Sequence, residues 1–338
     1  MRLARPVESP PAPQDWEAGL EQLLGWLGIA ADRSPAASGE RAAVFAPWLG
    51  WSPAAFQHGG APGLPQALFA ASYACDHPRN GRLTRGGVDL MLLSPHPAAC
   101  VPDVPAGPPR LRTSVLDAML AAARAEGRAR IALIVHARQR ASLAACGRSA
   151  AQGGETLDVL AIEDAIAPLA TGRAPWDAII AMPDLRSTVL ALLTATSGLR
   201  GVWPMLWFDA SSQGACVLRH VGGETLAVAE AGESASLLPL DATALVQTLA
   251  LSLHHSGASR AAGRLHEAWA ALQASGVTTT GRGAGDAPYV NAVADRAFID
   301  LMVRPRTPGR SPRPTWLAIN SAEIAISGTR MPALRVIA

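Results

Sequence analysis

The 338-residue sequence contains no lysine, so all 29 residues of its Lys+Arg total are arginine. This absence excludes chemistry that needs an ε-amino group, including Schiff-base catalysis, lysine proton transfer and Walker-type phosphate loops. Tyrosine is almost absent as well, with Tyr73 and Tyr289 as its only positions. Arginine in place of lysine, together with abundant alanine, glycine and proline, indicates a GC-rich bacterial genome.

Cysteine, net charge and long apolar runs are also scarce. The four cysteines lie far apart and form no CxxC pair, which is typical of reduced thiols in a cytoplasmic protein. The formal net charge is only +2 and the arginines are scattered, so we expect no nucleic-acid partner. No apolar stretch is long enough to span a membrane, and the proline-rich N-terminus contains no signal core, so we also expect no membrane partner.

Hydrophobic residues are abundant at 49% against 17% charged residues, as in a packed globular protein. From residue 114 onward, apolar runs alternate with helical patterns, which predicts an α/β sheet buried on both faces. The expected order is helix 114–126, strand 130–135, helix 137–151, strand 157–162, helix 163–171 and strand 178–182.

The remaining pattern predicts further strands and helices around this unit. Residues 48–65, rich in Gly, Pro and Trp, are expected to be irregular. Two helices, 187–196 and 243–255, are apolar almost all round, which indicates burial in a core or a subunit interface. The other expected elements are helices 16–27, 259–274 and 288–302 and strands 42–46, 88–93, 205–209, 215–220 and 226–229.

Five segments, in order, resemble the β-decarboxylating dehydrogenases, the family of isocitrate and isopropylmalate dehydrogenases. They are GGVDLMLL (86–93), RIALIVHARQR (130–140), LAIEDAIAPLATGRAPWDAIIAM (160–182), LALSLHHSGAS (249–259) and ALQASGVTTTGRGAGDAPYVNAVADRAFIDLM (271–302). The resemblance covers about residues 15–303. It implies an α/β fold with a central mixed sheet flanked by helices, truncated at the N-terminus because the family's opening strand and G-D-G-I-G-P turn are missing.

The resemblance also implies a division into domains. Residues 15–110 and 240–310 correspond to the large, former cofactor domain, and residues 111–239 to the small domain of dimerisation and substrate binding. Residues 1–14 are then a flexible proline-rich lead and residues 311–338 a C-terminal extension.

The family oxidises a 2-hydroxy acid with NAD(P) and uses Mg²⁺ or Mn²⁺, but most of its working residues are replaced here. Its lysine position falls on His136, and its substrate arginine after the 88–93 strand falls on Ser94. Its tyrosine belongs in the loop 95–109, which contains none. Of three metal-binding aspartates, the first survives as Glu163 or Asp164.

The other two metal positions fall on Ser187 and Ala191, although a shifted alignment brings in Asp184. In the adenine-binding loop, Glu233 stands at the ribose-binding acid and Asp241 near the family's asparagine, whereas the histidine and the glycine–lysine pair are gone. The sequence therefore predicts neither a metal nor a nicotinamide cofactor.

Three functions follow as hypotheses. The first is a non-catalytic family member that acts as a dimeric binding or regulatory protein. The second is an enzyme with altered chemistry on a small 2-hydroxy acid, using His136, Glu163 and Asp184. The third is a regulatory subunit that forms a heteromer with a catalytic homologue. A homodimer is expected through the two apolar helices, with interface residues Leu190, Leu193, Leu249 and Leu253.

Tryptophans in Gly/Pro-rich stretches offer a further hypothesis: they fill the space that a nucleotide would need. These residues are Trp48, Trp51, Trp203 and Trp207.

Overall fold

The computed structural model describes residues 2–3, 14–30, 44–51, 68–75, 89–102, 109–144, 155–197, 202–210, 216–225, 241–279 and 291–304. Its centre is a nine-stranded sheet with the order β1-β2-β11-β10-β3-β4-β9-β7-β8. The strands are β1 (Arg2–Leu3), β2 (Val44–Trp51), β3 (Phe69–Cys75), β4 (Asp89–Pro95), β7 (Arg130–Val135), β8 (Thr156–Ala161), β9 (Ala178–Ala181), β10 (Val202–Ala210) and β11 (Cys216–Thr225).

The sheet is mixed. Strands β4, β9, β7 and β8 run parallel, whereas β3 is antiparallel to both β4 and β10. Strand β11 pairs antiparallel with β10 and parallel with β2. Strands β4, β7 and β9 are almost wholly apolar because both of their faces are covered, whereas the edge strand β8 is partly exposed.

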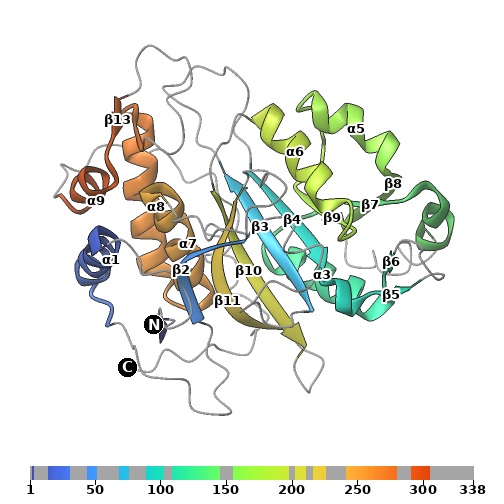
Figure 1. Cartoon of the computed structure of the whole chain (residues 1–338), viewed down its shortest axis with the longest axis horizontal. Coiled ribbons are helices and arrows are strands. Elements are labelled where there is room, and N and C mark those ends of the chain that lie inside the picture. The colour runs from blue at the N-terminus through green and yellow to red at the C-terminus, as the bar shows by residue number, and fades with distance from the viewer. Residues whose placement is uncertain are drawn as a thin grey trace.

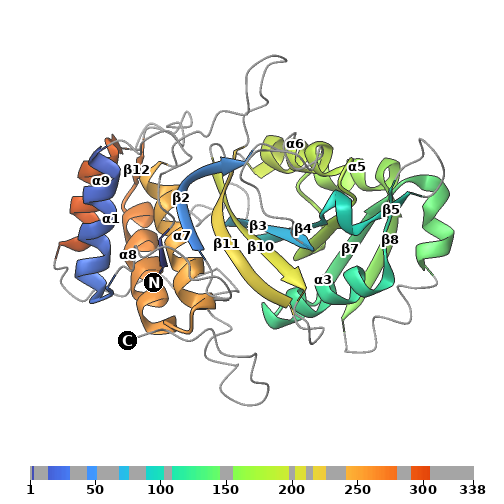
Figure 2. The same cartoon turned by 60° about the horizontal axis from the view of Figure 1, so that its bottom comes forward.

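Helices cover the sheet in two groups (Figures 1 and 2). Helices α5 (Ile162–Ala170) and α6 (Arg186–Ser197) lie on one face of the parallel strands, and α3 (Thr113–Ala125) lies on the other. Helices α1 (Gln14–Leu27), α7 (Ala242–His255), α8 (Ser259–Ala274) and α9 (Asp295–Val303) gather at the end of the molecule where β2 and β11 lie. The predicted class, a central mixed sheet flanked by helices, is confirmed. The division into two domains stays a prediction.

Short elements complete the fold. Two small sheets join β5 (Val101–Pro102) to β6 (Pro109–Arg110) and β12 (Val277–Thr279) to β13 (Asn291–Val293). Two 3₁₀ turns, η2 (Pro97–Ala99) and η3 (Ala137–Gln139), follow β4 and β7. None of the helices in the described ranges has the length and apolar character required to cross a membrane.

Several elements differ from the sequence-based expectation. Strand β3 was not predicted, because FAASYAC lacks a run of β-branched residues; pairing on both sides makes it a strand. Strand β2 continues to Trp51, so residues 48–51, which the sequence predicts to be irregular, belong to a strand. Its Pro47 falls between the two stretches that pair with β11, where a missing N–H breaks no bond of the ladder.

The expected helix 288–302 is wrong in its first part. Residues Asn291–Val293 pair with β12 as β13, and the helix begins only at Asp295 because Ala294 has an extended backbone. The helix expected from Ala137 opens as the 3₁₀ turn η3. The expected strand 226–229, the extension 311–338 and the continuation of the helix to 151 beyond residue 144 lie outside the described residues.

Helix α7 is apolar all round because it is a core helix of the single chain. Residues 242–253 are all buried, and the helix packs against α8 and β10. The four leucines expected at a dimer interface are likewise buried within one chain: Leu190, Leu193, Leu249 and Leu253. Their apolar character is therefore explained without a second subunit, and the homodimer stays a prediction.

Candidate functional site

Several described residues that could take part in acid–base chemistry or ligand binding lie where the parallel strands end. In open α/β sheets, ligands bind beyond the carboxyl ends of such strands. Here His96 follows β4, Asp184 follows β9, His136 follows β7 and Glu163 follows β8. Because β4, β9, β7 and β8 are neighbours in that order, these residues share one edge of the sheet.

His136 and Asp184 form the centre of this edge. The Nε2 atom of His136 lies 2.6 Å from Oδ2 of Asp184, and the two side chains are 31% and 40% exposed. His136 is the first residue after β7 and has an extended backbone, while Asp184 lies in a turn closed by the bond from Leu185 N to Met182 O. Adjacent strands thus bring together two residues that are 48 positions apart in the sequence.

Glu163, the third predicted member, does not join this pair. It is exposed in the first turn of α5, where a carboxylate is favoured by the helix dipole. Its neighbour Asp164 accepts a hydrogen bond of 2.8 Å from Arg140, with both side chains about half exposed. The structure therefore assembles two of the three residues predicted for altered chemistry.

Ser94, which the resemblance in sequence aligns with a substrate arginine of the β-decarboxylating dehydrogenases, has a buried hydroxyl that bonds within the chain. It accepts a 2.7 Å hydrogen bond from Nη1 of Arg186, and the Ser72 hydroxyl accepts another of 2.7 Å from Nη2. All three residues are 0% exposed. Sequence reasoning missed Arg186, because the acceptors that allow its burial come from β3 and β4, far away in the sequence.

Two neighbouring groups at this edge are also buried. His96 accepts a hydrogen bond from the N–H of Ala98 through Nδ1, and burial lowers the pKa of its imidazole. Burial raises the pKa of the Cys100 thiol to about 11, with a further increase from Asp184 and a decrease from Arg112. Cys100 is therefore a protonated thiol at neutral pH and not a nucleophile.

The residues at this edge do not fit the family's divalent metal. No three His, Cys, Asp or Glu side chains within the described ranges are arranged to hold a metal ion. The positions of two family aspartates carry Ser187 and Ala191, and Asp184 is paired with His136. A dedicated Mg²⁺ site requires more oxygen ligands than these.

The residue predicted near the cofactor's adenine has a structural role. Asp241 is the N-cap of α7: Oδ1 accepts from the N–H of Ala244 at 2.7 Å, and Oδ2 accepts from the Thr279 hydroxyl at 2.8 Å. Asp295 accepts from the N–H of Ala242 at the same helix end, and burial raises the pKa of its carboxyl. The other candidate, Glu233, lies outside the described residues.

Two of the four tryptophans in the nucleotide hypothesis are placed by the structure. Trp203 and Trp207 are buried on β10, and the ring of Trp207 meets that of His96 edge-on. They are core residues and not scattered surface residues. The side chains of Trp48 and Trp51 lie outside the described part of the chain.

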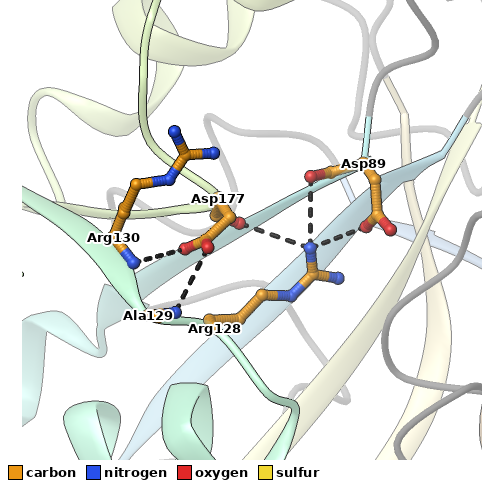
Figure 3. Close-up of polar contacts among 5 residues, drawn as sticks. All are labelled: Asp89, Arg128, Ala129, Arg130 and Asp177. Carbon is orange, nitrogen blue, oxygen red and sulfur yellow. Dashed lines mark hydrogen bonds and ion pairs between the residues drawn. The ribbon is translucent and has the colours of Figure 1, made fainter. Parts of the chain in front are cut away.

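A second polar cluster lies at the opposite edge, where β4, β7 and β9 begin (Figure 3). The Arg128 guanidinium is 0% exposed and lies 2.6 Å from the Asp89 carboxylate, with Nη1 also donating to the carbonyl oxygens of Asp89 and Asp177. The Asp177 carboxylate accepts from the backbone N–H groups of Ala129 and Arg130. This network fixes the starts of three strands and is structural.

The α/β fold, a central mixed sheet flanked by helices, is isocitrate dehydrogenase-like. Two solved structures share this fold. The TT0538 protein from Thermus thermophilus has a TM-score of 0.59 at 13% identity, over 92% of this chain and 69% of that one. The isocitrate dehydrogenase from Methylococcus capsulatus has a TM-score of 0.54 at 11% identity, over 89% of this chain and 97% of that one.

At such low identity the likeness establishes the fold and no more. No protein-family model matches the sequence, and no curated protein matches it either.

Proposed function

We propose that this chain is a binding or regulatory protein that uses an isocitrate dehydrogenase-like scaffold and does not catalyse oxidative decarboxylation. One observation carries the proposal: the hydroxyl of Ser94, at the position of a substrate-binding arginine, is enclosed and bonded to the buried Arg186. A group that is fully buried and occupied within the chain cannot also bind a substrate carboxylate.

The neighbouring positions support the same proposal. His136 stands in place of the catalytic lysine and is paired with Asp184, and Asp241 caps a helix near the former cofactor loop. In this proposal the scaffold keeps its apolar core, and Ser94 and Asp241 serve the structure of the chain. The proposed binding or regulatory role then depends on a partner protein, which is either a second copy of the chain or a catalytic homologue.

The activity test offers isocitrate, isopropylmalate and tartrate to the purified chain with NAD⁺ or NADP⁺ and Mn²⁺, and follows reduction of the nicotinamide. We expect no turnover above the rate without protein. The proposal is contradicted if activity on any of the three acids is found and this activity copurifies with the chain. Light scattering of the chain alone, and after co-expression with a catalytic homologue, then distinguishes a homodimer from a heteromer.

A second function, an enzyme of altered chemistry on a small 2-hydroxy acid, is favoured by the 2.6 Å contact between His136 and Asp184. A carboxylate that orients an imidazole is an arrangement used for general acid–base catalysis, which contributes about 10²–10⁴-fold to a rate.

If a panel of 2-hydroxy acids reveals turnover, His136→Gln and Asp184→Asn are each expected to reduce it by roughly 100-fold or more. Glu163→Gln is the matched control, because Glu163 is exposed and lies outside the pair. Turnover that survives His136→Gln unchanged rules out this second function.

A further inference from the structure

A buried carboxylate between two histidines joins the ends of two helices that are distant in the sequence. Glu126 is the C-cap of α3 and its side chain is only 4% exposed. Its Oε1 lies 2.9 Å from Nε2 of His255, and its Oε2 lies 4.0 Å from Nε2 of His254. Both histidines lie in the last turn of α7, so this contact connects the last turns of α3 and α7.

Other described groups lie close to this contact. Arg128 approaches from the turn after α3, paired with Asp89 at the start of β4, and Tyr73 lies on β3. The Phe208 ring of β10 packs edge-on against the His255 ring. The Tyr73 phenol stays neutral, because burial and then the charge of Glu126 raise its pKa well above the usual value.

The charges of this cluster make it sensitive to protons. With neutral imidazoles, Glu126 and Asp89 contribute two negative charges and Arg128 one positive charge, so one added proton neutralises the group. A second proton creates a buried excess of positive charge, with the two imidazole rings only 5.3 Å apart between centroids. An uncompensated charge in a buried site is strongly unfavourable.

We propose that Glu126, His254 and His255 form a pH-sensitive latch that holds the last turn of α7 against the end of α3 at neutral pH and opens on acidification. Glu126 belongs to residues 111–239 and the two histidines belong to residues 240–310, and the sequence predicts that these two parts form different domains. The latch therefore couples proton concentration to the contact between those two parts of the chain.

The titration of the individual groups supports this direction. Burial lowers the pKa of His254, although Glu126 partly counteracts it. Burial raises the pKa of Glu126, but the attraction of His255, together with that of His254 and Arg128, brings it below its usual value. A lowered pKa in the folded state stabilises the contact above the usual pKa and loses that stabilisation as the pH falls. The effect of His254 is therefore lost as the pH falls below its usual pKa of 6.5, whereas that of Glu126 is lost only below its usual pKa of 4.5, so His254 determines the response between pH 7.5 and pH 5.5.

The access of water to the latch is limited but present. The side chains of His254 and His255 are 14% and 11% exposed, so solvent protons can reach the imidazoles without unfolding of the core. The last turn of α7 is followed by Gly257 at a φ of 80°, a conformation that favours glycine and ends the helix there. The moving part is thus a helix end and not the whole helix.

The test is hydrogen–deuterium exchange of the full chain between pH 7.5 and pH 5.5, expressed as protection factors to remove the intrinsic pH dependence. We expect protection in the last turns of α7 and α3 to fall by roughly tenfold over this range, about the effect of one proton taken up on opening. Strand β7 serves as an internal reference and is expected to keep its protection. The measurement on the unaltered chain needs no variant, and constant protection at both helix ends overturns the proposal.

Variants then assign the effect to the latch. The double variant His254→Gln/His255→Gln is expected to show the same protection at both pH values. His266→Gln is the matched control, because His266 is a buried histidine of α8 that packs against Trp269, and it should keep the pH dependence at α7. A double variant that retains the dependence, or a control that loses it, contradicts the assignment. If the double variant does not fold, the single variant His254→Gln serves in its place, because His254 is the imidazole whose pKa burial lowers. A weakened pH dependence is expected, and an unchanged one contradicts the latch.

Discussion

The ion pair of Arg128 and Asp89 allows a quantitative test of the structure. Replacing Arg128 by Met removes a guanidinium that is 0% exposed while leaving the stem of the side chain to fill most of its space. The Asp89 carboxylate, 16% exposed, then loses its partner 2.6 Å away, and the carbonyl oxygens of Asp89 and Asp177 lose a donor.

Removing one partner of a buried ion pair costs about 3–5 kcal/mol. The lower end applies here for two reasons. Asp89 retains some contact with water, and Nε and Nη2 of Arg128 have no hydrogen-bond partner among the described residues, so their removal costs nothing. We therefore expect the free energy of unfolding to fall by about 3 kcal/mol, which lowers Tm by roughly 4 °C in a chain of this size.

Urea unfolding followed by far-UV circular dichroism measures the change. Arg130→Met is the matched control, because Arg130 is exposed and its hydrogen bonds with Asp177 are made by its backbone (Figure 3). It should unfold within about 0.5 kcal/mol of the unaltered chain. An Arg128→Met variant as stable as the control refutes the reasoning, whereas Asp89→Asn in the same chain should recover part of the loss by neutralising the carboxylate that has lost the guanidinium.

Three further predictions follow from other contacts. Gly25→Ala should raise the free energy of unfolding by about 0.5–1 kcal/mol, because nothing lies within 4 Å of the added Cβ; Gly19→Ala in the same helix should lack this gain, because its Cβ meets Ile299 Cδ1 at 2.6 Å. Equal urea midpoints for the two variants contradict the packing of α1 on α9. Asp241→Ala should cost about 1–2 kcal/mol through loss of the α7 cap and Asp241→Asn much less, measured by thermal unfolding; similar losses in both argue against the cap. Cys100, with a pKa of about 11, should remain unmodified by iodoacetamide at pH 8 in the folded chain and react in urea, as mass spectrometry of its peptide shows, and fast modification without urea contradicts its burial.

The sequence predicted the helices and parallel strands of the α/β unit well. Strand β7 and helix α8 have the predicted bounds, because apolar periodicity and terminating glycines are local signals. Strand β3 and the break between β13 and α9 could not be predicted, because their conformation depends on partner strands. The sequence could not assign helix α7 to the core of one chain, since burial within one chain and burial between two leave the same apolar pattern.

The candidate site likewise depends in part on the sequence alone and in part on the tertiary structure. The sequence by itself excluded chemistry that needs an ε-amino group, because the absence of lysine does not depend on the fold. Only the tertiary structure decided that His136 meets Asp184 while Glu163 stays apart, because strand order sets which loop ends become neighbours. The buried partners Arg186 and Glu126 carried no local signal, since a charge is stable in the interior only where distant segments supply its partners.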